Sequence, residues 1–129
     1  MDRDRDLISK SAAILIVEDD EDARSALAEV LEMSGYAAVG VSNGLEALGY
    51  LKDSQQLPSL IILDLMMHGM DGWEFRRLQK RDSKLAHIPV IVVTALNGAR
   101  IDANEIMVKP LDIESFLGVV KQYAGGQRG

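Results

Sequence analysis

Four short apolar runs, each ending in a charged or polar residue, constrain this chain more than any other feature. The runs cover residues 12–17, 59–63, 90–93 and 106–108. Uninterrupted apolar runs of this length are typical of parallel strands that are buried on both faces of a sheet. Because stretches of helical periodicity separate them, the sequence predicts a single α/β domain with a parallel sheet.

The residues that end these runs form an unusual set. Glu18 and Asp19 follow the first run, Asp64 follows the second, and Thr94 and Lys109 follow the last two. In open parallel sheets the functional crevice lies outside the carboxyl ends of the strands. We therefore expect three carboxylates, a hydroxyl and an ammonium group to meet at one edge of the sheet. An apolar core does not require that combination.

The rest of the chain supplies a short strand over residues 37–41 and four helices. Helices are expected over residues 21–34, after a cap at Asn43, from Asp71 to about Asp82, and from Asp112 onward.

The segment 96–105, between the fourth and fifth strands, is short for a parallel crossover, which usually contains a helix. It also holds the turn signal Asn97-Gly98. We predict at most about one helical turn there. The folded domain is expected to span residues 12–124, between a flexible extension at 1–11 and a flexible tail at 125–129.

Composition narrows the function classes. The 129 residues suit one domain, and the absence of cysteine excludes disulfides, thiolate catalysis and cysteine-ligated zinc. No apolar run approaches the roughly 20 residues of a membrane span, and the start lacks signal-peptide character. A net charge of −6 disfavours binding to nucleic acid. We expect a cytoplasmic protein without direct membrane or nucleic-acid binding.

The expected carboxylate cluster needs a counter-charge. Two carboxylates about 4 Å apart repel each other by about 4 kcal/mol at an effective dielectric constant near 20. A divalent cation relieves that repulsion, and hard oxygen ligands select Mg²⁺ or Mn²⁺. With Lys109 and Thr94 beside the cluster, the set matches what phosphoryl transfer requires, and an aspartate can be the nucleophile.

Four segments together resemble the receiver domain of two-component response regulators. They are residues 14–24, 60–72, 90–95 and 108–110, with sequences ILIVEDDEDAR, LIILDLMMHGMDG, VIVVTA and VKP. The likeness extends over roughly residues 12–124. It implies a flavodoxin-like three-layer sandwich whose five parallel strands have the order 2-1-3-4-5, here with the fourth helix shortened or missing.

The resemblance also implies a role for each acidic residue. Asp64 would accept a phosphoryl group from a phosphohistidine of a sensor kinase or of a histidine phosphotransfer protein. Asp19, Asp64 and the main-chain carbonyl of Met66 would bind Mg²⁺ (or Mn²⁺), with Glu18 acting beside them.

On the other side of the site, the resemblance implies phosphate contacts from Thr94, the Ala95 main-chain N–H and Lys109. It further implies a cis peptide bond between Lys109 and Pro110.

Three features depart from the usual family pattern. Ile106 stands where a rotating aromatic residue is usual, the short segment 96–105 stands where the fourth helix is usual, and His68 replaces a usual proline. The first two departures concern the output of the domain rather than its phosphorylation, and His68 is expected to loosen the loop after Asp64. We expect switching to be expressed mainly in loops 66–72 and 95–104.

The leading functional hypothesis is a stand-alone receiver that docks to an unknown downstream protein or relays its phosphoryl group. Such a protein is no enzyme beyond catalysing its own phosphoryl transfer and dephosphorylation. One alternative is a receiver-like binding module that is not phosphorylated. A phosphohydrolase of the haloacid-dehalogenase type is a third class, but Met66 stands where that chemistry needs an acid.

Several further residues have both a structural and a functional interpretation. His68 is expected to be a surface residue rather than a ligand, and Met66, Met67 and Met70 are expected to pack the loop. A basic helix side opposite Phe75 and Leu78, near Trp73, is either a solvated face or a docking surface for an acidic partner. Its residues are Arg76, Arg77, Lys80, Arg81 and Lys84.

Overall fold

The computed structural model describes residues 12–124, which form five strands and four helices. The elements are β1 (Ile14–Val17), α2 (Glu21–Met33), β2 (Ala38–Val41), α3 (Gly44–Asp53), β3 (Leu60–Leu63), α4 (Gly72–Arg81), β4 (Val90–Thr94), β5 (Glu105–Val108) and α5 (Ile113–Tyr123). All strands are parallel and their order is β2-β1-β3-β4-β5, which confirms the predicted flavodoxin-like topology. The predicted flexible ends, 1–11 and 125–129, lie outside the described residues.

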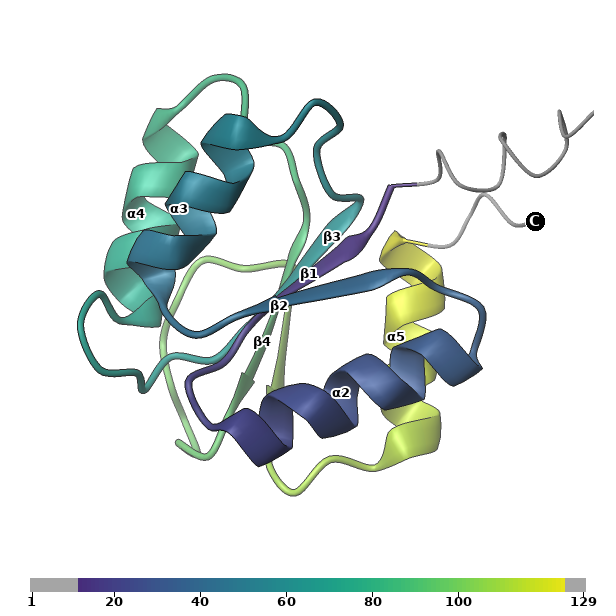
Figure 1. The fold of residues 1–129 in the computed structure, drawn as a ribbon. Coiled ribbons are helices and arrows are strands. Elements are labelled where there is room, and N and C mark those ends of the chain that lie inside the picture. Colours follow the sequence, from purple (N-terminus) through teal and green to yellow (C-terminus); the bar gives the residue numbers. More distant parts are fainter. Residues whose placement is uncertain (1–11, 125–129) are drawn as a thin grey trace, which may run out of the picture.

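The sheet forms the middle of three layers. Helices α3 and α4 cover one face, and α2 and α5 cover the other (Figure 1). Successive residues of a strand point to opposite faces, so Leu15 and Val92 pack under α3 and α4, whereas Ile14 and Val93 pack under α2 and α5. Strands β1, β3 and β4 are buried at every position, as the continuous apolar runs predicted.

Every helix begins at an acidic or amide side chain that caps it. Asp20, Asn43, Asp71 and Asp112 each accept a hydrogen bond from the main-chain N–H three residues ahead. At α3 the Glu46 carboxylate reaches back to the main-chain N–H and the hydroxyl of Ser42 rather than to Asn43. These caps satisfy main-chain donors that the first turn of a helix leaves unpaired, and they fix where each of these helices begins.

Strand β5 differs from the prediction that all four apolar runs are buried on both faces. Its side chains alternate in exposure, and Ile106 and Val108 remain 38% and 40% exposed. The cause is local, because β5 lies at the edge of the sheet and the described chain has no helix between β4 and β5. The prediction of at most one helical turn in this segment is confirmed.

In place of a helix, an extended segment crosses from β4 to β5. Ala99, Ile101 and Ala103 pack against the core layer under α3 and α4. Side chains of helix α4 donate hydrogen bonds to the main chain of the residues that alternate with these three. The indole N–H of Trp73 donates to the Arg100 carbonyl at 3.0 Å.

Arg76 corrects the expectation of a solvent-facing basic helix side. It is only 8% exposed. Its guanidinium group donates to the Asp102 carbonyl at 2.7 Å and to the Gln79 side chain at 2.8 Å. The main chain of the extended segment needs a partner that a helix would have supplied internally, and Arg76 provides it. Arg77, Lys80, Arg81 and Lys84 do remain exposed, and Lys80 forms an ion pair with Asp102.

Replacing Arg76 with Ala is expected to destabilise the fold by about 2 kcal/mol, because the part-buried Asp102 carbonyl and the buried Gln79 side chain lose their donor. Replacing the neighbouring Arg77 should cost less than about 0.5 kcal/mol, since its ion pair with Glu74 is exposed. Urea unfolding of both variants measures the difference. Equal losses would contradict a structural role for Arg76.

Candidate functional site

Three carboxylates meet at the carboxyl ends of β1 and β3. These strands are neighbours, with Val17 aligned to Leu63, so the residues that follow them are brought together. One carboxylate oxygen each from Glu18, Asp19 and Asp64 lies within 4.8 Å of the others. Glu18 and Asp64 are only 2% and 7% exposed. The predicted convergence of these residues at the sheet edge is therefore present.

Lys109 closes this cluster from the end of β5. Its Nζ donates to Oε1 of Glu18 at 2.9 Å, and its main-chain N–H donates to the Thr94 carbonyl at 2.8 Å. Burial alone would lower the pKa of Lys109, but the hydrogen bond to Glu18 and the charge of Asp64 raise it overall. Lys109 thus stays cationic and offsets one negative charge. The Lys109–Pro110 peptide bond is cis, as the resemblance implied.

The surroundings of Asp64 disfavour the charged form of its carboxyl group. Burial, and next the charge of Glu18, raise its pKa to about 6, although Lys109 and the Met66 N–H act in the opposite direction. A divalent cation bound between the carboxylates would remove this penalty. The donors are all hard oxygens, so the residues fit Mg²⁺ or Mn²⁺.

Asp19 has a partner that the sequence did not reveal. Its Oδ2 lies 3.1 Å from the main-chain nitrogen and 2.9 Å from ring Nδ1 of His68, a residue 49 positions away. Partial burial raises the pKa of Asp19, but these hydrogen bonds outweigh it and lower the pKa. The His68 side chain is fully exposed, so its expected surface position is confirmed, but its contact with the acidic cluster was missed.

The other predicted site residues lie at the ends of β3 and β4. Thr94 is fully buried, and its Oγ1 accepts a hydrogen bond from the Leu96 N–H, which leaves the hydroxyl proton for a ligand. Ala95 is exposed at the same strand end. Their phosphate contacts, and the metal contact of the Met66 carbonyl, stay predictions.

The three loop methionines do not behave alike. Met67 and Met70 pack against the core, as expected, whereas the Met66 side chain is 55% exposed. The main-chain N–H of Met66 faces Oδ1 of Asp64 at 3.4 Å. The expectation that all three would pack the loop is therefore wrong for Met66.

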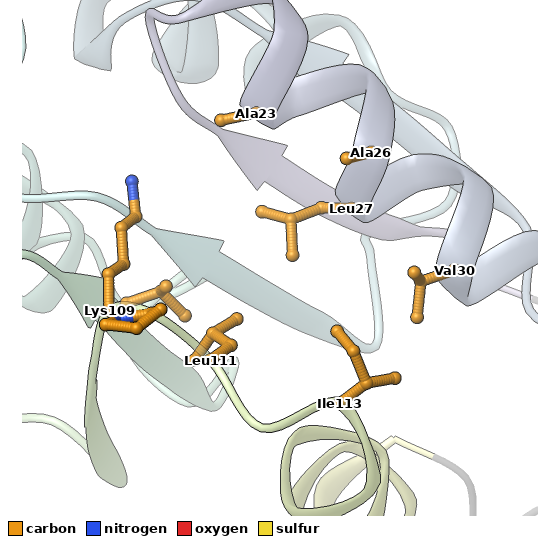
Figure 2. Close-up of a pocket in the computed structure, with 9 residues that line it drawn as sticks. Ala23, Ala26, Leu27, Val30, Lys109, Leu111 and Ile113 are labelled. Carbon is orange, nitrogen blue, oxygen red and sulfur yellow. The ribbon is translucent and has the colours of Figure 1, made fainter.

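An apolar cavity of about 520 Å³ lies beside Lys109, between α2 and the connection from β5 to α5. Figure 2 shows Ala23, Ala26 and Val30 of α2 across the cavity from Lys109 and Ile113. The small alanine side chains leave this space open. The sequence analysis missed the cavity, since only the packing of α2 against the chain after β5 creates it.

Comparisons with known proteins agree with this geometry. The family model of the response regulator receiver domain matches residues 14–121. The polar-differentiation response regulator DivK of Brucella anthropi is 33% identical over 121 residues, which are 88% of this chain and 96% of that protein. No helix within the described part of the chain is long and apolar enough to cross a membrane.

Two solved structures show the same likeness. The receiver domain of a signal transduction histidine kinase from Syntrophus aciditrophicus superposes with a TM-score of 0.82 at 33% identity, covering 90% of this chain and 92% of that one. The response regulator TrrA of Thermotoga maritima, solved in complex with Mg²⁺ and BeF, gives 0.77 at 30% identity, with coverages of 87% and 98%. This chain therefore belongs to the response regulator receiver domain family.

Proposed function

We propose that this chain is a cytoplasmic single-domain response regulator that accepts a phosphoryl group on Asp64 in a Mg²⁺-dependent reaction. The donor is a phosphohistidine of a sensor kinase or of a histidine phosphotransfer protein. The observation that carries the proposal is the cluster of Glu18, Asp19 and Asp64, in which Glu18 and Asp64 are buried and Lys109 lies beside them. Three converging carboxylates are costly for a fold and serve no packing purpose.

The chemistry is a direct transfer. A carboxylate oxygen of Asp64 forms a bond to phosphorus while the bond from phosphorus to the donor imidazole nitrogen breaks, and that nitrogen keeps the electron pair. When bound, the divalent ion supplies positive charge to the site. Lys109 and the Thr94 hydroxyl then stabilise the added negative charge from the neighbouring strand ends. The protein thus catalyses only its own phosphorylation and dephosphorylation.

Two surfaces are suited to partner proteins, one to the phosphodonor and one to a downstream protein. The apolar cavity beside Lys109 opens next to the cluster, and it would accept apolar side chains of the phosphodonor protein. After phosphorylation the domain either docks to a downstream protein or passes the phosphoryl group on. The exposed Ile106 and Val108 on β5 lie in the part of the fold that lacks its usual helix, so a downstream partner meets an altered surface there.

Intact-mass measurement after incubation with Mg²⁺ and acetyl phosphate tests the proposal. The wild type should gain one phosphoryl mass, and Asp64→Asn should gain none. Asp71→Asn is the matched control, because Asp71 is another loop aspartate that caps α4 and lies outside the cluster. The control should be modified like the wild type, and chelation of Mg²⁺ should abolish the gain. A wild type that no small donor or kinase modifies would refute the proposal.

The alternative, a binding module that is not phosphorylated, is favoured by the missing helix and by the exposed Ile106. Trp73 distinguishes the two, because its indole donates to Arg100 in the segment where switching is expected. For a functional receiver, Trp73 fluorescence should change on adding Mg²⁺ and again on adding beryllofluoride. A signal that responds to neither addition favours the binding module.

A further inference from the structure

One oxygen of Asp19 receives both hydrogen bonds from His68. Oδ2 lies 3.1 Å from the main-chain nitrogen and 2.9 Å from Nδ1 of the ring. A carboxylate can only accept hydrogen bonds, so Nδ1 carries the proton in this contact. His68, in loop 66–72, thus donates two hydrogen bonds to the same oxygen of Asp19, one from its main chain and one from its side chain.

The two carboxylate oxygens of Asp19 therefore have different roles. Oδ2 accepts both hydrogen bonds from His68, so Oδ1 is the oxygen without a His68 contact and the better ligand for a cation shared with Glu18 and Asp64. Outer contacts of this kind orient metal-binding side chains and influence metal affinity by about 10- to 100-fold. At this position the residue type matters, since a proline would lack both donors.

We propose that His68 is a positioning residue that limits Asp19 to one ligating oxygen and so favours Mg²⁺ over Ca²⁺. Mg²⁺ requires compact octahedral coordination, with oxygens at about 2.0–2.1 Å, and is satisfied by single carboxylate oxygens. Ca²⁺ takes 6–8 oxygens at about 2.3–2.6 Å and readily uses both oxygens of one carboxylate. The inference rests on the proposed Mg²⁺-dependent function and adds a selectivity residue to that site.

Four variants distinguish the contribution of the His68 ring donor from that of the His68 main-chain donor. His68→Ala removes the ring donor, and His68→Pro also removes the main-chain donor. His68→Asn keeps a donor, because its side-chain amide nitrogen can take the place of Nδ1. His87→Ala is the matched control, since His87 is the other histidine of the chain and is exposed outside the cluster.

Calorimetric titration of each metal-free protein with Mg²⁺ and, separately, with Ca²⁺ gives the ratio of the two dissociation constants. The preference for Mg²⁺ should fall about fivefold in His68→Ala, the factor for one hydrogen bond of about 1 kcal/mol, and about tenfold or more in His68→Pro. His68→Asn and His87→Ala should keep the wild-type ratio. A residue that merely ordered the loop would change both affinities equally.

An unchanged ratio in His68→Ala and His68→Pro, with or without a parallel loss of both affinities, overturns the inference while leaving the proposed function intact. Uptake of neither ion by the wild type removes the proposed function and the inference with it. His68→Ala keeps the test valid if the proline variant does not fold.

Discussion

Replacing Gly72 with Ala should destabilise the fold by about 3 kcal/mol, near the top of the usual range for overpacking. A Cβ at this position would lie 2.5 Å from the Asp64 carbonyl oxygen and 2.8 Å from the Leu65 Cα. Both are main-chain atoms at the end of β3, and the Gly72 N–H donates to the Leu65 carbonyl. The clash therefore cannot be relieved by turning a side chain. Either α4 or the strand end that carries Asp64 must move.

Gly118→Ala is the matched control for this prediction. Gly118 lies within α5, and an added Cβ there meets nothing within 4 Å. Alanine in the middle of a helix is more favourable than glycine by about 0.5–1 kcal/mol, so this variant should be slightly more stable than the wild type. Urea unfolding followed by circular dichroism measures both variants. A Gly72→Ala protein within 1 kcal/mol of the wild type would show that α4 does not need this close approach.

Replacing Asp64 with Asn should stabilise the metal-free protein above pH 6 by about 2–3 kcal/mol, while abolishing phosphorylation. The pKa of Asp64 is raised from 3.8 to about 6, chiefly by burial and next by Glu18. The folded state thus binds the Asp64 proton more tightly than the unfolded state. The stability that protonated Asp64 contributes to the folded state is fully present below about pH 4 and is lost as the pH rises through about 6. Asparagine, which does not titrate, avoids that loss.

The difference between the two proteins, measured by thermal or urea unfolding from pH 4 to pH 8, isolates this effect from other titrating groups. It should be near zero at pH 4 and should level off above pH 6. Adding Mg²⁺ at pH 8 should stabilise the wild type more than Asp64→Asn, because the variant lacks one ligating carboxylate. A constant difference at all pH values would mean that Asp64 is not strained in its charged form.

Much of this fold follows from local sequence. The apolar runs identified β1, β3, β4 and β5, and the caps at Asn43, Asp71 and Asp112 marked helix starts to within a residue. The site followed as well, because the carboxyl ends of parallel strands share one edge and Glu18, Asp19 and Asp64 end neighbouring strands. The strand order came from the resemblance, since periodicity does not specify which strands are neighbours.

The features that the sequence did not predict depend on contacts between distant parts of the chain. The hydrophobicity of the run 106–108 indicates a strand, but only its place at the sheet edge exposes Ile106 and Val108. Helical periodicity placed Arg76 on a solvated side, whereas the extended segment before β5 covers it and accepts its hydrogen bond.

The sequence by itself determined the α/β class, the ends of the elements and the residues at the sheet edge, because these depend on local periodicity and on capping chemistry. Only the tertiary structure decided that His68 holds Asp19, that Lys109 binds Glu18, and that a cavity opens between α2 and the β5–α5 connection. Each of these features joins groups far apart in the chain. Their partners are set by how the layers pack, which no local pattern encodes.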